Sequence, residues 1–134
     1  AHNYKVFTAS TGQEGLSLIT SCFPDLILLD LGLPDIDGMD IIKKVRKWSM
    51  VPILVISART QEQEKVLALD SGSDDYITKP FGTSELLARI RTALRRHQQQ
   101  HNPCCQHTFS FHIIDILLTK SFACRFLIVF SSIL

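Results

Sequence analysis

The sequence predicts an α/β fold built on a doubly wound, parallel β-sheet. Two continuous apolar runs, residues 25–30 and 52–56, have the length and composition of strands buried on both faces. A segment with helical spacing follows each run, and strands that alternate with helices at this interval form βαβ units. The first run ends in a carboxylate, Asp30, at the sheet edge where open α/β sheets place their chemistry.

Length and composition limit the class of protein to which the chain can belong. The 134 residues suit one domain with a real core, and a net charge of +1 gives no reason to expect a nucleic-acid or membrane field. The chain opens with Ala1 and no signal peptide, so we expect a fragment of a cytoplasmic protein. The four cysteines lack the spacing of a disulfide framework, so we expect free thiols; they are Cys22, Cys104, Cys105 and Cys124.

The first elements follow in chain order. Residues 4–9 are rich in β-branched and aromatic side chains and predict a short strand. Thr11 and Glu14 have the spacing of a capping box, which predicts a helix over residues 12–21. The apolar run 25–30 is then the central strand.

A second helix is predicted after the turn-rich segment that follows Asp30. Its apolar face would consist of four side chains at helical spacing, Ile41, Ile42, Val45 and Trp48. The run 52–56 is the next strand. It leads directly into Ser57 and Ala58 at its carboxyl end.

The next helix has both a start and a stop signal. Thr60 and Gln63 have capping-box spacing, and Gly72 is placed to end a helix over residues 61–71. Residues 75–77 form a brief strand. The final predicted helix, 83–96, turns four apolar side chains inward, namely Leu86, Leu87, Ile90 and Leu94.

Composition changes after residue 97. We expect a domain over residues 1–97, a polar linker over 98–108 that contains Pro103, and an aberrant or truncated tail over 109–134. The last apolar run of the tail is far shorter than the roughly 20 residues that span a bilayer, so no membrane segment is expected.

Reactive side chains follow three successive strands. If these strands are parallel neighbours, Asp30, Ser57 and Lys79 converge at one edge of the sheet. Such a trio suits a phosphoryl group held on a carboxylate. Asp30 would be the nucleophile, Ser57 and the backbone N–H of Ala58 would bind phosphoryl oxygens, and Lys79 would pair with their charge. Each residue alone is explained better as a loop cap or a surface charge; the combination at successive strand ends favours the phosphoryl site.

Three motifs carry a family resemblance. Residues 28–38 (LLDLGLPDIDG), 55–59 (VISAR) and 74–81 (DDYITKPF) resemble the receiver domain of response regulators of the OmpR/PhoB family. The resemblance covers residues 4–97. It implies a flavodoxin-like (CheY-like) fold with strand order 2-1-3-4-5, and a role in two-component signal transduction and transcription regulation.

The resemblance assigns roles at the edge of the sheet. Asp30 is implied to be the phosphoacceptor, which takes its phosphoryl group from a sensor histidine kinase. Asp30 and the carbonyl of Gly32 are implied ligands of Mg²⁺. Ser57 matches the switch hydroxyl, Tyr76 the switch aromatic and Lys79 the phosphate-sensing lysine, with a cis peptide bond after it.

The same resemblance implies a homodimer through the face spanned by residues 61–96. It pairs six charged residues across a two-fold axis: Lys65 with Glu85, Asp70 with Arg91, and Asp75 with Arg89. From the residues alone, an ordinary solvated surface is the better explanation of these charges, because exposed pairs contribute only about 0–1 kcal/mol each. No DNA binding by this chain is expected, because the resemblance to a winged-helix domain ends after Lys120.

The chain also departs from the family pattern. The first strand and first helix of the family have no counterpart, and the two acids that hold Mg²⁺ are lost with them. We therefore expect impaired phosphorylation, and poor folding unless another segment fills the middle of the sheet. The apolar run 126–130 is a candidate for that position, although Ser131 and Ser132 follow it where acids are expected.

The spacing of possible ligands argues against other sites. An EF-hand with Gly38 at its sixth position would begin at Leu33 and end at Lys44, and both are wrong for calcium. A zinc site fits no known spacing of the available ligands, which are His97, His101, Cys104, Cys105, His107 and His112. An aspartyl-phosphate phosphatase needs a second acid near Asp30, so no enzyme is expected. Two functions stay open: a phosphorelay receiver, and a dimerisation remnant that cannot be phosphorylated.

Overall fold

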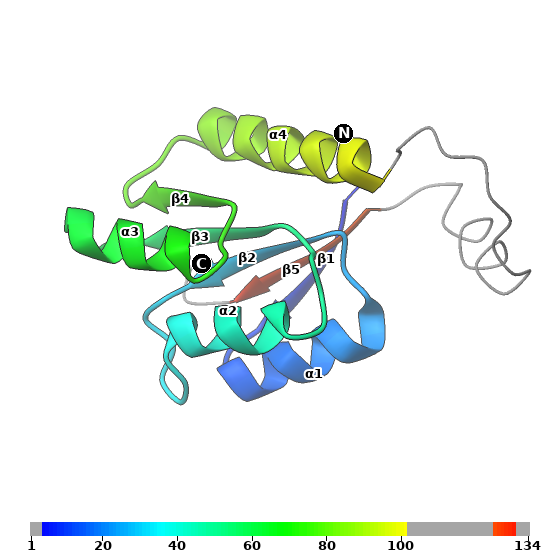
Figure 1. Cartoon of the computed structure of the whole chain (residues 1–134), viewed down its shortest axis with the longest axis horizontal. Coiled ribbons are helices and arrows are strands. Elements are labelled where there is room, and N and C mark those ends of the chain that lie inside the picture. The colour runs from blue at the N-terminus through cyan, green and yellow to red at the C-terminus, as the bar shows by residue number, and fades with distance from the viewer. Residues whose placement is uncertain (1–3, 102–124, 131–134) are drawn as a thin grey trace, which may run out of the picture.

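Strands and helices alternate along the chain in the computed structural model, which describes residues 4–101 and 125–130 (Figure 1). The elements are β1 (Tyr4–Ala9), α1 (Gly12–Cys22), β2 (Leu26–Asp30), α2 (Gly38–Arg46), β3 (Ile53–Ser57), α3 (Glu62–Asp70), β4 (Asp75–Thr78), α4 (Thr83–His101) and β5 (Arg125–Phe130). This pattern confirms the predicted α/β class.

All five described strands are parallel, in the order β1-β5-β2-β3-β4. The strand nearest the carboxyl terminus therefore lies in the middle of the sheet, between β1 and β2 (Figure 1). It pairs with β1 from Arg125 to Phe130, and with β2 from Leu127 to Val129. This arrangement confirms the hypothesis that the run 126–130 fills the middle position.

The sheet separates two layers of helices. Side chains of β2 alternate between them: Ile27 and Leu29 pack in the cluster beneath α1, α2 and α3, whereas Leu26 and Leu28 pack in the cluster beneath α4. Every residue of β2 and β3 is buried. Burial on both faces explains why these two strands appear in the sequence as continuous apolar runs rather than as alternating patterns.

The start of α1 differs in detail from the predicted capping box. The Oγ1 atom of Thr11 accepts a hydrogen bond from the backbone N–H of Glu14 (3.2 Å), as predicted. The carboxylate of Glu14 also accepts from the backbone N–H (2.9 Å) and hydroxyl (3.0 Å) of Ser10, one residue before the predicted cap, and these two bonds are the largest causes of its lowered pKa. The helix ends at Phe23, which adopts a left-handed conformation (φ 47°).

Trp48 is not part of the buried face of α2. The helix ends at Arg46, and the backbone N–H groups of Trp48 and Ser49 both bind the carbonyl of Val45 in a closing turn. Trp48 is consequently 49% exposed. The prediction for this residue was wrong because helical spacing alone does not show where the helix stops.

Of the two sequence signals predicted for α3, the start signal was wrong and the stop signal is confirmed. The capping box at Thr60 was wrong: Gln61 is the N-cap and makes no side-chain capping bond. Gly72 does end the helix, with a φ of +111° that favours glycine. The N–H of Gly72 bonds to Leu69 (3.0 Å) and that of Ser73 to Ala68 (3.1 Å), which is the hydrogen-bond pattern of a Schellman motif.

The last helix is longer than predicted. Residues 98–101, expected to belong to a linker, continue α4, because glutamine is a good helix former and the first helix-breaking proline is Pro103. None of the described helices is long and apolar enough to cross a membrane. The rest of the predicted linker, and the tail outside β5, lie outside the described residues.

Candidate phosphoacceptor site

Three neighbouring strands end at one edge of the sheet, and each brings a reactive side chain there. Asp30 is the last residue of β2 and Ser57 the last of β3, while Lys79 directly follows β4. The register places Asp30 beside Ile56, and Ser57 beside Thr78. The three residues therefore lie at one edge of the sheet, and the carboxylate of Asp30 and the ammonium of Lys79 meet there (2.9 Å).

The carboxylate of Asp30 is held on both of its oxygens. Its Oδ1 accepts a hydrogen bond from the backbone N–H of Gly32 (2.8 Å), and its Oδ2 forms an ion pair with Lys79 Nζ (2.9 Å). Asp30 is 5% exposed. A buried carboxylate requires such partners, because an unpaired buried charge is strongly unfavourable.

The backbone around Lys79 fixes that ion pair. Its N–H donates to the carbonyl of Ser57 (2.9 Å), which extends the β3–β4 ladder by one residue. The following peptide bond, Lys79–Pro80, is cis, as the family resemblance implied. Lys79 thus emerges from the end of β4 with its ammonium group directed at Asp30.

Ser57 and Tyr76 are both connected to the loop that follows β3. The buried Oγ atom of Ser57 accepts from the backbone N–H of Arg59 (3.1 Å), and Tyr76 Oη donates to the carbonyl of Arg59 (3.0 Å). The guanidinium of Arg59 forms an ion pair with Glu64 on α3 (3.2 Å). Sequence reasoning gave Arg59 no role, and no local pattern signals one, because its partners come from three different elements.

A sequence model of the response regulator receiver domain matches residues 1–91. The chain belongs to the receiver domains of two-component response regulators. Curated relatives include the KDP operon transcriptional regulatory protein KdpE of Escherichia coli K12, which is 51% identical over 84% of this chain. The response regulator ArlR of Staphylococcus aureus MW2 is 50% identical over 73% of this chain. Both are regulators of the OmpR/PhoB family. The matched regions cover 50% and 45% of these relatives, so this chain spans about half their length.

Solved receiver domains share the fold. The BeF3-activated receiver domain of Klebsiella pneumoniae RstA superposes with a TM-score of 0.68 at 34% identity, over 70% of this chain and 80% of that one. A CheY-like receiver domain of Methanospirillum hungatei JF-1 also gives 0.68 at 30% identity, over 72% of this chain and 78% of that one.

The acids after Asp30 in this receiver domain hold helix termini. The carboxylate of Asp35 accepts from the backbone N–H groups of Gly12 (2.7 Å) and Gln13 (3.0 Å) at the start of α1, and Asp37 caps α2 through Met39 (3.0 Å). The bond from Gly12 is the main reason that the pKa of Asp35 is lowered. Sequence reasoning missed this contact, which joins residues far apart in the chain.

Metal ligands near Asp30 are few. Within residues 4–101 and 125–130, no group of three or more His, Cys, Asp or Glu side chains could hold a metal ion. Of the six residues weighed for zinc, only His97 has a described side chain. The carboxylate of Asp30 and the carbonyl of Gly32 are hard oxygen donors of the kind Mg²⁺ prefers, and Mg²⁺ often completes its shell with phosphate and water oxygens.

The predicted dimer face lies on α3, β4 and α4. Arg89 is already paired within the chain: it bonds to Asp75 (2.8 Å) and Glu85 (3.0 and 3.1 Å), and the bond to Asp75 is the largest cause of its raised pKa. The Nζ atom of Lys65 lies 6.0 Å from the ring centre of Tyr76. Asp70 and Arg91 are exposed.

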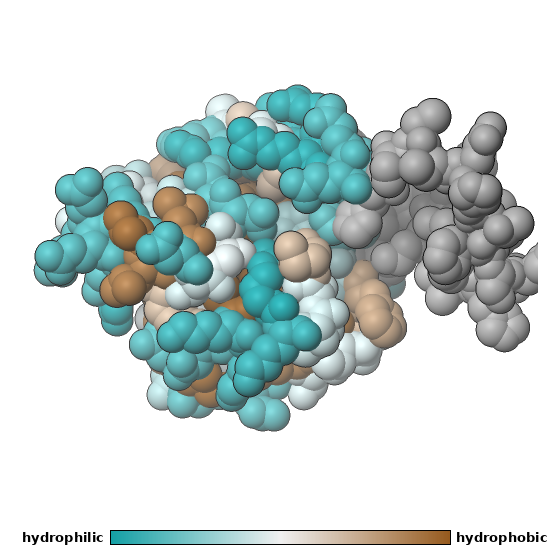
Figure 2. Space-filling view, viewed as in Figure 1, coloured by the Kyte–Doolittle hydropathy of each residue, from teal (hydrophilic) through white to brown (hydrophobic). Residues whose placement is uncertain are grey.

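The same face carries an exposed apolar patch on α3. The patch consists of Val66, Leu67 and Leu69, which are 49%, 58% and 46% exposed. Figure 2 shows this apolar surface over α3, surrounded by hydrophilic residues. Contiguous exposed apolar side chains of this kind mark interaction surfaces.

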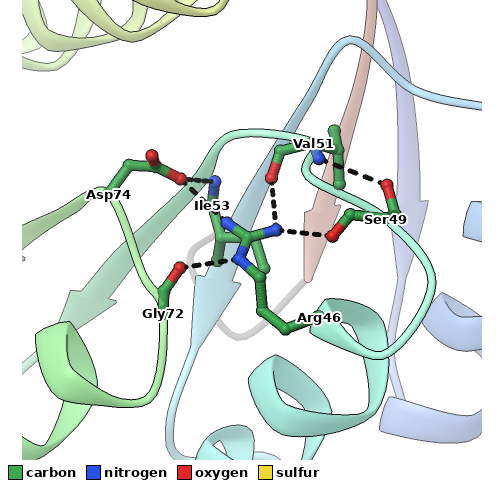
Figure 3. Close-up of polar contacts among 6 residues, drawn as sticks. All are labelled: Arg46, Ser49, Val51, Ile53, Gly72 and Asp74. Atoms are coloured by element: carbon green, nitrogen blue, oxygen red, sulfur yellow. Dashed lines mark hydrogen bonds and ion pairs between the residues drawn. The ribbon is translucent and has the colours of Figure 1, made fainter.

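A polar clasp at the opposite edge of the sheet was not anticipated from the sequence (Figure 3). The guanidinium of Arg46 donates to the carbonyls of Gly72 (2.8 Å), Ser49 (3.2 Å) and Val51 (2.7 Å), and it forms an ion pair with Asp74 (2.9 Å). Burial lowers the pKa of Arg46, while the charge of Asp74 opposes that shift. The clasp joins the end of α2 to the segments that enter β3 and β4.

Proposed function

We propose that Asp30 accepts a phosphoryl group from the phosphohistidine of a sensor histidine kinase. The observation that carries this proposal is the carboxylate held between the N–H of Gly32 and the ammonium of Lys79 at the carboxyl edge of a parallel sheet. Membership of the receiver family supports the same role.

In the transfer step, an oxygen of Asp30 attacks phosphorus. The N–P bond of the donor breaks as the O–P bond to Asp30 forms, and the imidazole, protonated on its other nitrogen, leaves as the neutral ring. The ammonium group of Lys79, which is paired with Asp30, is close enough to pair with the transferred phosphoryl group and to offset the negative charge of its oxygens. Ser57 ends β3 and Ala58 follows it at the same edge, where the Ser57 hydroxyl and the Ala58 backbone N–H donate to those oxygens.

The route from this site to the rest of the molecule runs through the β3–α3 loop. A hydroxyl of Ser57 that turns to a phosphoryl oxygen gives up its bond from the N–H of Arg59. The carbonyl of Arg59 accepts a hydrogen bond from Tyr76, and the guanidinium of Arg59 donates to Glu64 on α3. Phosphorylation at Asp30 would therefore change the contacts that this loop makes with Tyr76 on β4 and with Glu64 on α3.

Mg²⁺ would be held by the carboxylate of Asp30 and the carbonyl of Gly32, where it offsets the charge of the phosphoryl oxygens. Two protein ligands make a weak site, and both oxygens of Asp30 already have partners. We therefore propose that phosphorylation of this chain is slow and needs a high Mg²⁺ concentration.

The α3 patch favours a second candidate function. Its three exposed apolar side chains and the charged residues around it fit a two-fold contact with another copy. Under this alternative, the chain dimerises through α3, β4 and α4 and is not phosphorylated.

One experiment separates the two candidates. The full chain is incubated with Mg²⁺ and either an autophosphorylated sensor kinase or a small phosphodonor, and intact-mass spectrometry detects the added phosphoryl group. We expect the label on the chain and none on the Asp30→Asn variant. Absence of label from a folded chain that still forms dimers, measured by light scattering, would favour the dimerisation module.

A further inference from the structure

The middle of the sheet is occupied by β5, which follows α4 by way of residues 102–124. β5 pairs with β1 along its full length and with β2 through Leu127–Val129. In the described sheet, β1 has β5 as its single neighbour. The attachment of β1 to the other described strands thus depends on β5, although β5 follows all of them in the sequence.

The connection to β5 does not confine that strand to its own chain. Residues 102–124 join α4 to β5, and a segment of that length reaches roughly 75 Å at full extension. A domain of about 100 residues has a radius of gyration near 13 Å. The segment is therefore long enough to carry its strand to the same position in an adjacent copy.

Such an exchange leaves the free energy of the sheet itself nearly unchanged. A strand from a second copy would form the same backbone ladders with β1 and β2 that the chain's own strand forms. The balance then depends on concentration, because a tethered strand has an effective concentration in the millimolar range. Chains that fold at lower concentration insert β5 into their own sheet. Chains that fold at a comparable concentration can insert β5 into the sheet of a second copy.

We propose that the position between β1 and β2 is an exchangeable strand-binding site, and that Arg125–Phe130 of a second copy can occupy it. Reciprocal exchange gives a dimer in which each sheet is completed by the other chain. Because β2 ends at Asp30, one of the two neighbours of the phosphoacceptor strand would then come from the second copy. This interface is separate from the α3 patch, and it does not require phosphorylation.

The test uses two full-length versions of the chain that differ in mass tag. They are either mixed while folded, or unfolded in urea and refolded together at micromolar and near-millimolar concentrations. Native mass spectrometry then measures the mixed dimer. We expect mixed dimers after joint refolding at the high concentration and very few after mixing folded chains, because exchange requires β5 to leave the sheet. Dimers diluted afterwards should persist for as long as global unfolding takes.

Two variants separate strand exchange from surface contact. Leu67→Glu places a charge in the α3 patch and should leave the exchanged dimer unchanged. Ile128→Pro removes a backbone N–H from the centre of β5 and should abolish the exchanged dimer. Mixed dimers that form between folded chains, vanish on dilution and are lost in Leu67→Glu would overturn the proposal. A chain that stays monomeric after refolding at every concentration would also overturn it.

Discussion

The ion pair between Asp30 and Lys79 joins two strand ends at the carboxyl edge of the sheet. Lys79 reaches Asp30 from a strand that is two positions away in the sheet, and the carboxylate it meets is almost fully buried. Its geometry depends on the register of β2, β3 and β4, so it reports whether that edge is assembled.

A double-mutant cycle with Asp30→Asn and Lys79→Met tests this contact. We expect the two changes to be non-additive, with a coupling free energy of about 1–3 kcal/mol in urea unfolding, because each single change leaves the other group without its charged partner. Lys47→Met, an exposed lysine on the other edge, serves as the matched control and should be additive with Asp30→Asn. Additivity of all pairs would show that the pair contributes nothing.

Among residues, the sequence predicted those that act through local position. Asp30, Ser57 and Lys79 are recognisable because each follows a strand, and parallel strands end at one edge. Arg46 and Arg59 were missed because the fold brings their partners close: backbone carbonyls and Asp74 for Arg46, and Tyr76 and Glu64 for Arg59. No spacing rule identifies a backbone carbonyl as the partner of a distant side chain.

At the level of elements, the Arg46 clasp determines how α2, β3 and β4 meet. One guanidinium satisfies three backbone carbonyls in the turns that enter the sheet, and Asp74 in addition accepts the N–H of Ile53 (2.8 Å). Arginine suits this position, because its planar group presents several donors at fixed angles.

Replacing Arg46 by methionine should destabilise the chain by about 2–4 kcal/mol, since it leaves buried carbonyls without donors. Arg46→Lys should recover a small part of that loss, because one ammonium cannot reach every acceptor. Lys47→Met, an exposed neighbour, should change stability by less than about 0.5 kcal/mol. Urea unfolding monitored by circular dichroism measures all three. Equal effects at positions 46 and 47 would contradict this account of the clasp.

The contact between Asp35 and the start of α1 makes stability depend on pH. The pKa of Asp35 is lowered in the folded state, chiefly by the N–H of Gly12. A lowered folded pKa means that the stabilisation is fully present above the unfolded pKa of about 3.9. It is lost as the pH falls through the folded value.

We therefore expect Asp35→Ala to lower the unfolding midpoint at neutral pH, and the difference from the parent chain to shrink as the pH falls below about 4. Thermal unfolding followed between neutral pH and the acid range measures it. Glu62→Ala, which removes an exposed acid from the first turn of α3, should show a smaller difference. A constant difference for Asp35→Ala across the whole range would exclude titration of this carboxyl as the cause.

For the molecule as a whole, the apolar runs predicted the class of the fold and the family motifs predicted its sheet. The order of the strands was harder to predict, because the position of β5 depends on pairings between residues that are 121 positions apart for β1 and 101 positions apart for β2. Its apolar pattern allowed the hypothesis. Only the register with both neighbours establishes that the strand is parallel and central.

A chain that lacks residues 125–134 tests the importance of β5 directly. Its removal takes away the ladders to both β1 and β2, at about 1 kcal/mol per hydrogen bond, from a domain whose net stability is about 5–15 kcal/mol. We expect the shortened chain to lose its cooperative thermal transition, and α1 to lose protection from hydrogen exchange, because β1 is no longer attached to the sheet. Removing residues 131–134 alone should leave the transition in place. A sharp transition at an unchanged midpoint in the chain ending at residue 124 would show that the other strands hold the fold without β5.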